Sequence, residues 1–264
     1  MSSLALNLRR QTFDGGDPNF RLDVGSVLGR TFEVWTRNLG PFCVVGLIVE
    51  SPVLLGLAAI ALSGSSMPIL QRLLELTSNV LALILTGAVT FGVFRHLEGE
   101  RAGLGEILHL GFSRLGTVWG TAILTGLATA LGFCALIIPG LILMARFWVS
   151  VPVAVIEQPG ASAAMGRSGE LTAGNRWRVF AVAMVLGAVL VASTLAFGLL
   201  LGLLSTSIPT TGTGAAQPAW QQGLLELFVL PILALNATGP AIVYHDLRVG
   251  KEGADVEELI RVFA

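Results

Sequence analysis

The sequence predicts an all-α polytopic membrane protein with six transmembrane helices and both termini on the cytoplasmic side. Three observations predict this. Of the 264 residues, 53% are hydrophobic and only 12% are charged, whereas soluble domains carry about 25% charged residues. Six apolar stretches approach the roughly 20 residues that a spanning helix needs. Fourteen of the sixteen basic residues fall on one side of these stretches, and such an excess marks the cytoplasmic side.

The six stretches cover about residues 39–62, 73–95, 117–138, 140–157, 178–204 and 223–245. The third and fourth are almost continuous and are interrupted only by Ile138-Pro139-Gly140. Proline removes a backbone donor and glycine permits a tight reversal, so we expect this motif to form the apex of a helical hairpin on the outer side. A single kinked helix of this length would extend about 60 Å, twice the thickness of the hydrocarbon core.

Three short segments that precede the odd-numbered stretches resemble one another. Residues 24–37, 104–115 and 161–173 place apolar side chains at the i, i+3, i+4 spacing of an amphipathic helix. The expected apolar faces are Val24, Val27, Leu28, Phe32 and Trp35; then Leu104, Leu108, Phe112 and Leu115; then Ala164, Met165 and Leu171. The pattern favours a threefold repeat of interfacial helix and hairpin. Alternatively, the bundle simply needs amphipathic connectors.

The predicted organisation has three parts. Residues 1–19 form a cytoplasmic tail, residues 20–246 the membrane domain, and residues 247–264 a C-terminal cytoplasmic amphipathic helix. Asp255-x-x-Glu258 in the last part has the spacing of a capping box. The first 38 residues hold no apolar run typical of a signal peptide, so we expect the first apolar stretch to direct insertion.

Two ionisable residues, Glu50 and Arg146, are predicted to lie deep in the membrane at matched depths. A charge near the bilayer centre costs at least about 2.5–3.5 kcal/mol, so both are expected to face the bundle interior. They could form a substrate or ion site, or a structural pair between the first two hairpins. Glu50 could also remain protonated. Asn236, before a Gly-Pro pair in the sixth stretch, is a further intramembrane binding candidate or a kink site.

Sequence motifs of enzymes are scarce, so an enzymatic role is not favoured. The chain has no HExxH, CxxC, GxSxG or GxxxxGK[ST] pattern. We therefore expect no catalytic residues, no metal site and no cofactor. The net charge of −1 gives no reason to expect nucleic-acid binding.

Several short motifs resemble a family of bacterial proteins. They are Ile138-Pro139-Gly140, Arg146, Val155-Ile156-Glu157, Arg167-Ser168 with Leu171, Trp177-Arg178, the tail from Tyr244 to Arg248 with Lys251 to Asp255, and the opening Gly25-Ser26-Val27-Leu28 with Thr31-Phe32 and Asn38. In this order they resemble the membrane domain attached to some glycerophosphoryl diester phosphodiesterases, which also occurs alone. The resemblance covers roughly residues 20–256.

The resemblance implies an integral inner-membrane protein and no phosphodiesterase activity, because the sequence contains no HRG-type catalytic segment. Gly169 departs from the family, which usually has a bulky residue there. Among the matching positions, Glu157, Ser168, Asp246 and Arg248 are candidates for a motif on the cytoplasmic face.

These observations leave three functional hypotheses. The leading one is a non-enzymatic protein of the bacterial inner membrane that organises or regulates the envelope by contacting the lipid bilayer, anionic lipids or another membrane protein. The second is a small transporter or channel that uses Glu50 and Arg146. The third is a lipid-modifying enzyme, in which one of the three histidines at the cytoplasmic interface would act. The sequence does not indicate the oligomeric state.

Overall fold

The computed structural model describes residues 20–64, 67–99, 103–206 and 218–253, and every regular element in these ranges is a helix. Six helical segments are long and apolar enough to cross a membrane. They are α3 (Leu39–Ser63), α4 (Pro68–Leu97), α6 (Leu115–Ala135), the segment Ile137–Ile156 formed by α7 (Ile137–Phe147) and α8 (Ser150–Ile156), α10 (Arg176–Thr206) and α11 (Ala219–Glu252). The prediction of an all-α polytopic membrane protein is confirmed.

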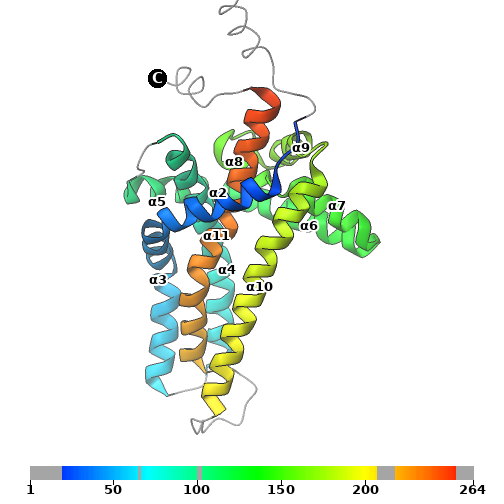
Figure 1. Ribbon diagram of the computed structural model, residues 1–264. Coiled ribbons are helices and arrows are strands. Elements are labelled where there is room, and N and C mark those ends of the chain that lie inside the picture. Colours follow the sequence, from blue (N-terminus) through cyan, green and yellow to red (C-terminus); the bar gives the residue numbers. More distant parts are fainter. Residues whose placement is uncertain (1–19, 65–66, 100–102, 207–217, 254–264) are drawn as a thin grey trace, which may run out of the picture.

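Four of these helices, α3, α4, α10 and α11, run lengthwise in one bundle (Figure 1). Helix α11 contacts each of the other three. At one end of the bundle lie the short helices α2 (Val24–Arg37), α5 (Leu104–Ser113) and α9 (Ala161–Leu171), and we call this the connector end. The opposite end, where α3 ends and α4 begins, is the loop end.

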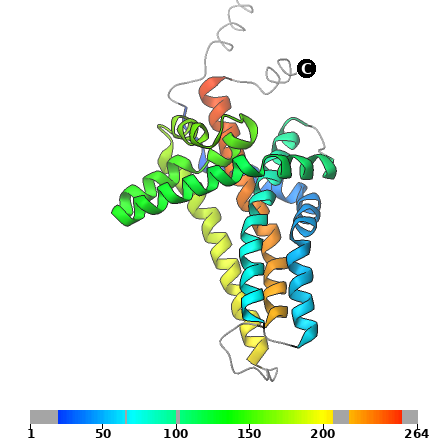
Figure 2. The same ribbon diagram turned by 180° about the vertical axis from the view of Figure 1, so that it is seen from behind.

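The hairpin of α6 and α7 has a different direction from the bundle. It leaves the bundle at the connector end and runs sideways across its axis, with its tip inclined toward the loop end (Figures 1 and 2). Helices α6 and α7 pack against each other; α6 also contacts α8, α9 and α4, and α7 contacts the bundle through α10. The sequence led us to expect the apex on the outer side. In the structure the apex lies beside the bundle, away from the turn between α3 and α4 at the loop end (Figures 1 and 2).

The apex is also formed by a different residue from the one expected. The chain breaks at Leu136, whose φ of −165° and ψ of 155° are extended. Pro139 lies in the first turn of α7, where its missing N–H costs no hydrogen bond. Gly140 serves packing, because a Cβ there would lie 2.5 Å from the Phe133 ring. The two helices can therefore approach closely at this glycine.

The three connector helices lie where the sequence predicts them. In α2 Val27 of the expected face is buried, and Val24, Leu28 and Trp35 pack against the core, while Phe32 is exposed. The face expected for residues 104–115 is buried only in part: Leu108 and Leu115 pack against the core, whereas Leu104 and Phe112 are exposed. The buried residues of α5 are Ile107 and Gly111, which lie outside the expected face. The cause is the absence of a side chain at Gly111, where a Cβ would lie 3.1 Å from Ala88 on α4.

The C-terminal boundary differs from the expected one. Helix α11 continues without interruption through residues 246 and 247 and ends at Gly253, whose φ is +61°. This left-handed conformation is one that glycine adopts without strain. The apolar stripe expected after residue 254 and the tail of residues 1–19 lie outside the described residues.

The contact between α10 and α11 yields a test of the packing. A Cβ at Gly239 would lie 2.2 Å from Cδ1 of Leu186, which is fully buried. We expect Gly239→Ala to lower the free energy of unfolding by about 1–3 kcal/mol, because overpacking forces neighbouring side chains out of place. Gly187→Ala in α10 is the matched control, since a Cβ there meets nothing within 4 Å and alanine favours the helix. Thermal unfolding in detergent would measure both, and equal stability of the two variants would contradict the packing.

Candidate functional site

A group of polar side chains joins α11 to the turn between α8 and α9. Tyr244, Arg248 and Glu252 lie one turn apart on the same face of α11. The Tyr244 hydroxyl donates to Glu157 at 2.8 Å and accepts from Arg248 at 3.0 Å. Arg167 of α9 donates from Nε to Glu157 at 3.0 Å and from Nη2 to Glu252 at 2.8 Å. We call these five residues the connector clamp.

In the connector clamp, acidic and basic side chains neutralise each other in a partly buried position. Tyr244 is fully buried and meets Phe94 edge-on at 5.5 Å between ring centroids. The side chain of Arg167 is 27% exposed and that of Glu157 is 19% exposed. Burial lowers the pKa of Arg167, but its bonds to Glu157 and Glu252 outweigh this, so the pKa rises. The guanidinium is therefore charged at every physiological pH.

The neighbouring face of α11 holds α2 in place. Asp246 pairs with Arg30 of α2 and lies 3.3 Å from Nδ1 of His245. Asn175, before α10, donates to the carbonyl of Phe20 and accepts from the N–H of Leu22, both at 2.9 Å. These bonds fasten the start of the described chain to the connector end.

Ser168 and Arg146 meet at the junction between α7 and α9. The Ser168 hydroxyl donates to the carbonyl of Arg146 at 2.7 Å and so satisfies an acceptor in the last turn of α7. The guanidinium of Arg146 lies against Gly169, where a Cβ would come within 2.6 Å of Nε. A bulky residue at position 169 would therefore collide with Arg146.

Glu50 and Arg146 form no ion pair, so the structural pair, one of the alternatives that the sequence left open, is not observed. Glu50 lies near the middle of α3, inside the bundle, and faces Ser78 of α4 and Glu226 of α11. Arg146 lies in α7, which leaves the bundle sideways. Two residues at the same predicted depth in the membrane come together only if their helices run side by side. Helices α3 and α7 do not.

The side chain of Asn236 bonds to the backbone of its own helix, α11. Its side-chain nitrogen donates to the carbonyl of Ile232 at 3.1 Å. Four residues later Pro240 lacks the N–H that would pair with the Asn236 carbonyl. This arrangement agrees with a local irregularity of α11.

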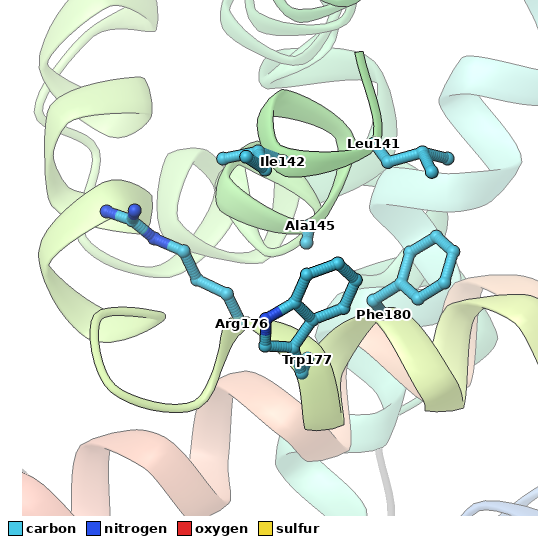
Figure 3. Close-up of a pocket in the computed structure, with 6 residues that line it drawn as sticks. All are labelled: Leu141, Ile142, Ala145, Arg176, Trp177 and Phe180. Atoms are coloured by element: carbon cyan, nitrogen blue, oxygen red, sulfur yellow. The ribbon is translucent and has the colours of Figure 1, made fainter. Parts of the chain in front are cut away.

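A small pocket lies where α7 crosses the start of α10. It has a volume of about 140 Å³, comparable with a cavity that holds one benzene-sized molecule. The lining residues are Leu141, Ile142 and Ala145 of α7 and Arg176, Trp177 and Phe180 of α10. Figure 3 shows the Trp177 indole beneath α7, with the Arg176 guanidinium directed away from the aromatic rings.

The pocket combines an apolar wall with an uncompensated charge. The rings of Trp177 and Phe180 meet edge-on at 5.9 Å, and Trp177 is 68% exposed. Arg176 has no hydrogen bond or ion pair within the described part of the chain, and its Nε is buried. Lys251 is close enough to Arg176 to repel it electrostatically. The site can thus accept an apolar chain and an anionic group together.

Sequence reasoning identified only part of these sites. It selected Glu157, Ser168, Asp246 and Arg248, all of which make the contacts described above, but no residue of the pocket was selected as a site. It overlooked Glu226, although a carboxylate within a long apolar run is a detectable signal. It named Tyr244, the only tyrosine in the chain, within the tail motif but not as a site residue.

In comparisons with known proteins, no family model, curated protein or solved structure matches this chain. The family resemblance therefore rests on the short motifs alone.

The clamp can be tested by removing its shared cation. Arg167→Gln leaves Glu157 and Glu252 without their main partner, so we expect the protein to lose roughly 1–3 kcal/mol of stability, less than for a fully buried pair. Arg37→Gln is the control, because Arg37 and Glu33 are 65% and 54% exposed and such pairs contribute about 0–1 kcal/mol. Thermal unfolding of the purified protein reports both, and a loss no greater than the control's would show that the clamp is not structural.

Proposed function

We propose that the protein is a multi-pass protein of the bacterial inner membrane that organises phospholipid in the cytoplasmic leaflet. In this proposal four helices cross the bilayer, the α6–α7 hairpin lies sideways within one leaflet, and the pocket beneath α7 binds an anionic lipid. The observation that carries the proposal is the direction of the hairpin relative to the bundle.

The orientation follows from the basic residues. Among described residues, the loop-end half of the bundle holds only Arg72, and the others lie at or near the connector end: Arg21, Arg30, Arg37, Arg95, Arg114, Arg146, Arg167, Arg176, Arg178, Arg248 and Lys251. Because arginine and lysine are retained on the cytoplasmic side, the connector end is cytoplasmic in this proposal. Both ends of the α6–α7 hairpin then start from that side.

The surface of the hairpin supports a position in lipid. Leu127 and Leu131 of α6 are 60% and 62% exposed, and Leu136, Ile137 and Ile138 at the apex are 67–70% exposed. Contiguous exposed apolar surface of this kind is unfavourable in water. A hairpin that enters from the interface keeps its helical backbone bonds and covers these side chains with acyl chains.

The pocket explains how a lipid would be held. An acyl chain would contact Ile142, Trp177 and Phe180, while the phosphate would lie near Arg176. Arginine binds phosphate with several parallel hydrogen bonds, and tryptophan is favoured at the level of the headgroups. The proposed role is therefore binding and ordering of lipid, with no catalytic step.

Lipid binding can be measured by native mass spectrometry in mixtures of phosphatidylglycerol and phosphatidylcholine. We expect the wild-type protein to retain phosphatidylglycerol preferentially. Arg176→Gln should reduce this binding about tenfold, because a charge-assisted hydrogen bond contributes about 1.5–3 kcal/mol. Trp177→Ala should weaken retention of both lipids.

Arg37→Gln is the matched control, because it removes an arginine at the same end that already pairs with Glu33. Equal lipid retention by Arg176→Gln and Arg37→Gln would contradict the pocket assignment. No preference for the anionic lipid in the wild-type protein would contradict the proposal as a whole.

A further inference from the structure

Glu50 is a carboxylate buried in the middle of the bundle without a partner for one of its oxygens. It is 1% exposed, and its Oε2 atom makes no hydrogen bond. A buried polar atom left in this state costs about 1–3 kcal/mol if neutral and more if charged. The arrangement therefore requires an explanation, and the neighbours of the Glu50 carboxyl group include the polar residues Ser78 and Glu226.

This group contains a second carboxylate. Ser78 of α4, which is 8% exposed, directs its hydroxyl toward Glu226 of α11, with 3.3 Å between Oγ and Oε2. Glu50 lies next to the same hydroxyl and interacts electrostatically with Glu226. A serine hydroxyl has a single proton to donate, so it cannot satisfy both carboxylates.

No basic side chain compensates these two charges within the described residues. Helix α3 has no basic residue, and α11 has its basic residues only at the connector end. In the loop-end half of α4 the only one is Arg72, whose Nη1 lies 2.7 Å from Oε2 of Glu75. Two facing carboxylates in an apolar region cannot both remain ionised without a large cost, so the pair is most stable with a bound proton.

A series of polar side chains links the pair to the loop end. Glu75 has a side chain that is 40% exposed, and it accepts a hydrogen bond of 3.1 Å from Gln222. One turn further into the bundle lie Ser78 and Glu226, followed by Glu50. Beyond Glu50 the packing is apolar, since Leu230 reaches within 3.4 Å of a Cβ placed at Gly46.

We propose that Glu50 and Glu226 form a proton-binding carboxyl pair in the membrane, which exchanges protons with the loop-end surface through Ser78, Gln222 and Glu75. Because the apolar packing beyond Glu50 closes the other side, the site binds and releases protons on one side only. The ligand is a proton, and the site is separate from the lipid pocket at the connector end.

Infrared spectroscopy of the protein in dodecyl maltoside micelles tests the proposal directly, because this detergent has no ester carbonyl whose band would overlap that of a protonated carboxyl group. A protonated carboxyl group has a C=O stretching band that an ionised one lacks. We expect such a band in the wild-type protein at neutral pH, its disappearance at high pH, and its absence at neutral pH in Glu50→Gln. In Glu226→Gln the band of Glu50 should disappear at a lower pH than in the wild-type protein, because a neighbouring negative charge is removed.

Glu33→Gln is the control, since Glu33 is exposed on α2 and pairs with Arg37, and it should leave the band unchanged. Thermal unfolding of each variant checks that it is folded, and the wild-type spectrum is informative even if Glu50→Gln is not. Absence of the band at neutral pH in the wild-type protein would overturn the proposal. Loss of the band on addition of Na⁺ at constant pH would also overturn it and indicate a metal-cation site.

Discussion

The bond between α9 and α11 through Arg167 is the constraint on which the rest of the arrangement depends. Arg167 binds Glu157 at the end of α8 and Glu252 at the end of α11. It thereby holds the turn from α8 to α9 against the central helix of the bundle. Because Ser168 in the same helix binds the last turn of α7, the direction in which the α6–α7 hairpin leaves the bundle is determined at this point.

The position of the hairpin has consequences for both proposals. With α7 outside the bundle, Arg146 cannot compensate Glu50, and the space opposite Glu50 is occupied by Ser78 and Glu226. The pocket lies between α7 in this position and α10, and Arg176 has no counter-charge among the residues that the structure describes. The proposed lipid site and the proposed proton site thus arise from one architectural feature, although they lie in different parts of the molecule.

The sequence predicted the local structure well, because hydrophobic periodicity is a local property. It located α2, α5 and α9 and all six candidate spans to within seven residues. It could not predict the direction of the hairpin, which depends on contacts of Arg167 with Glu157 and Glu252 over up to 85 residues of sequence. The structural pair of Glu50 and Arg146, one of the alternatives considered, is not observed for the same reason, since it requires their helices to run side by side.

The buried pair of Glu50 and Glu226 could have been predicted in part from the sequence. Glu226 lies in an apolar stretch like Glu50 and could have been noted, but its contact with Ser78 depends on the register between α4 and α11. Helix α5 shows a similar limit: periodicity placed Leu104 and Phe112 on its apolar face, whereas the close approach at Gly111 turns Ile107 toward α4. Neither register nor close approach can be read from a single helix.

The most direct test of the account is the accessibility of the hairpin apex from the outer side of the membrane. In a background with Cys43→Ser and Cys134→Ser, a membrane-impermeant maleimide would be added to intact spheroplasts that carry Ile138→Cys or Met67→Cys. The account predicts that Met67→Cys at the loop end is labelled and that Ile138→Cys at the apex is not. Labelling of Ile138→Cys to the same extent as Met67→Cys would show that the hairpin crosses the bilayer and would contradict the account.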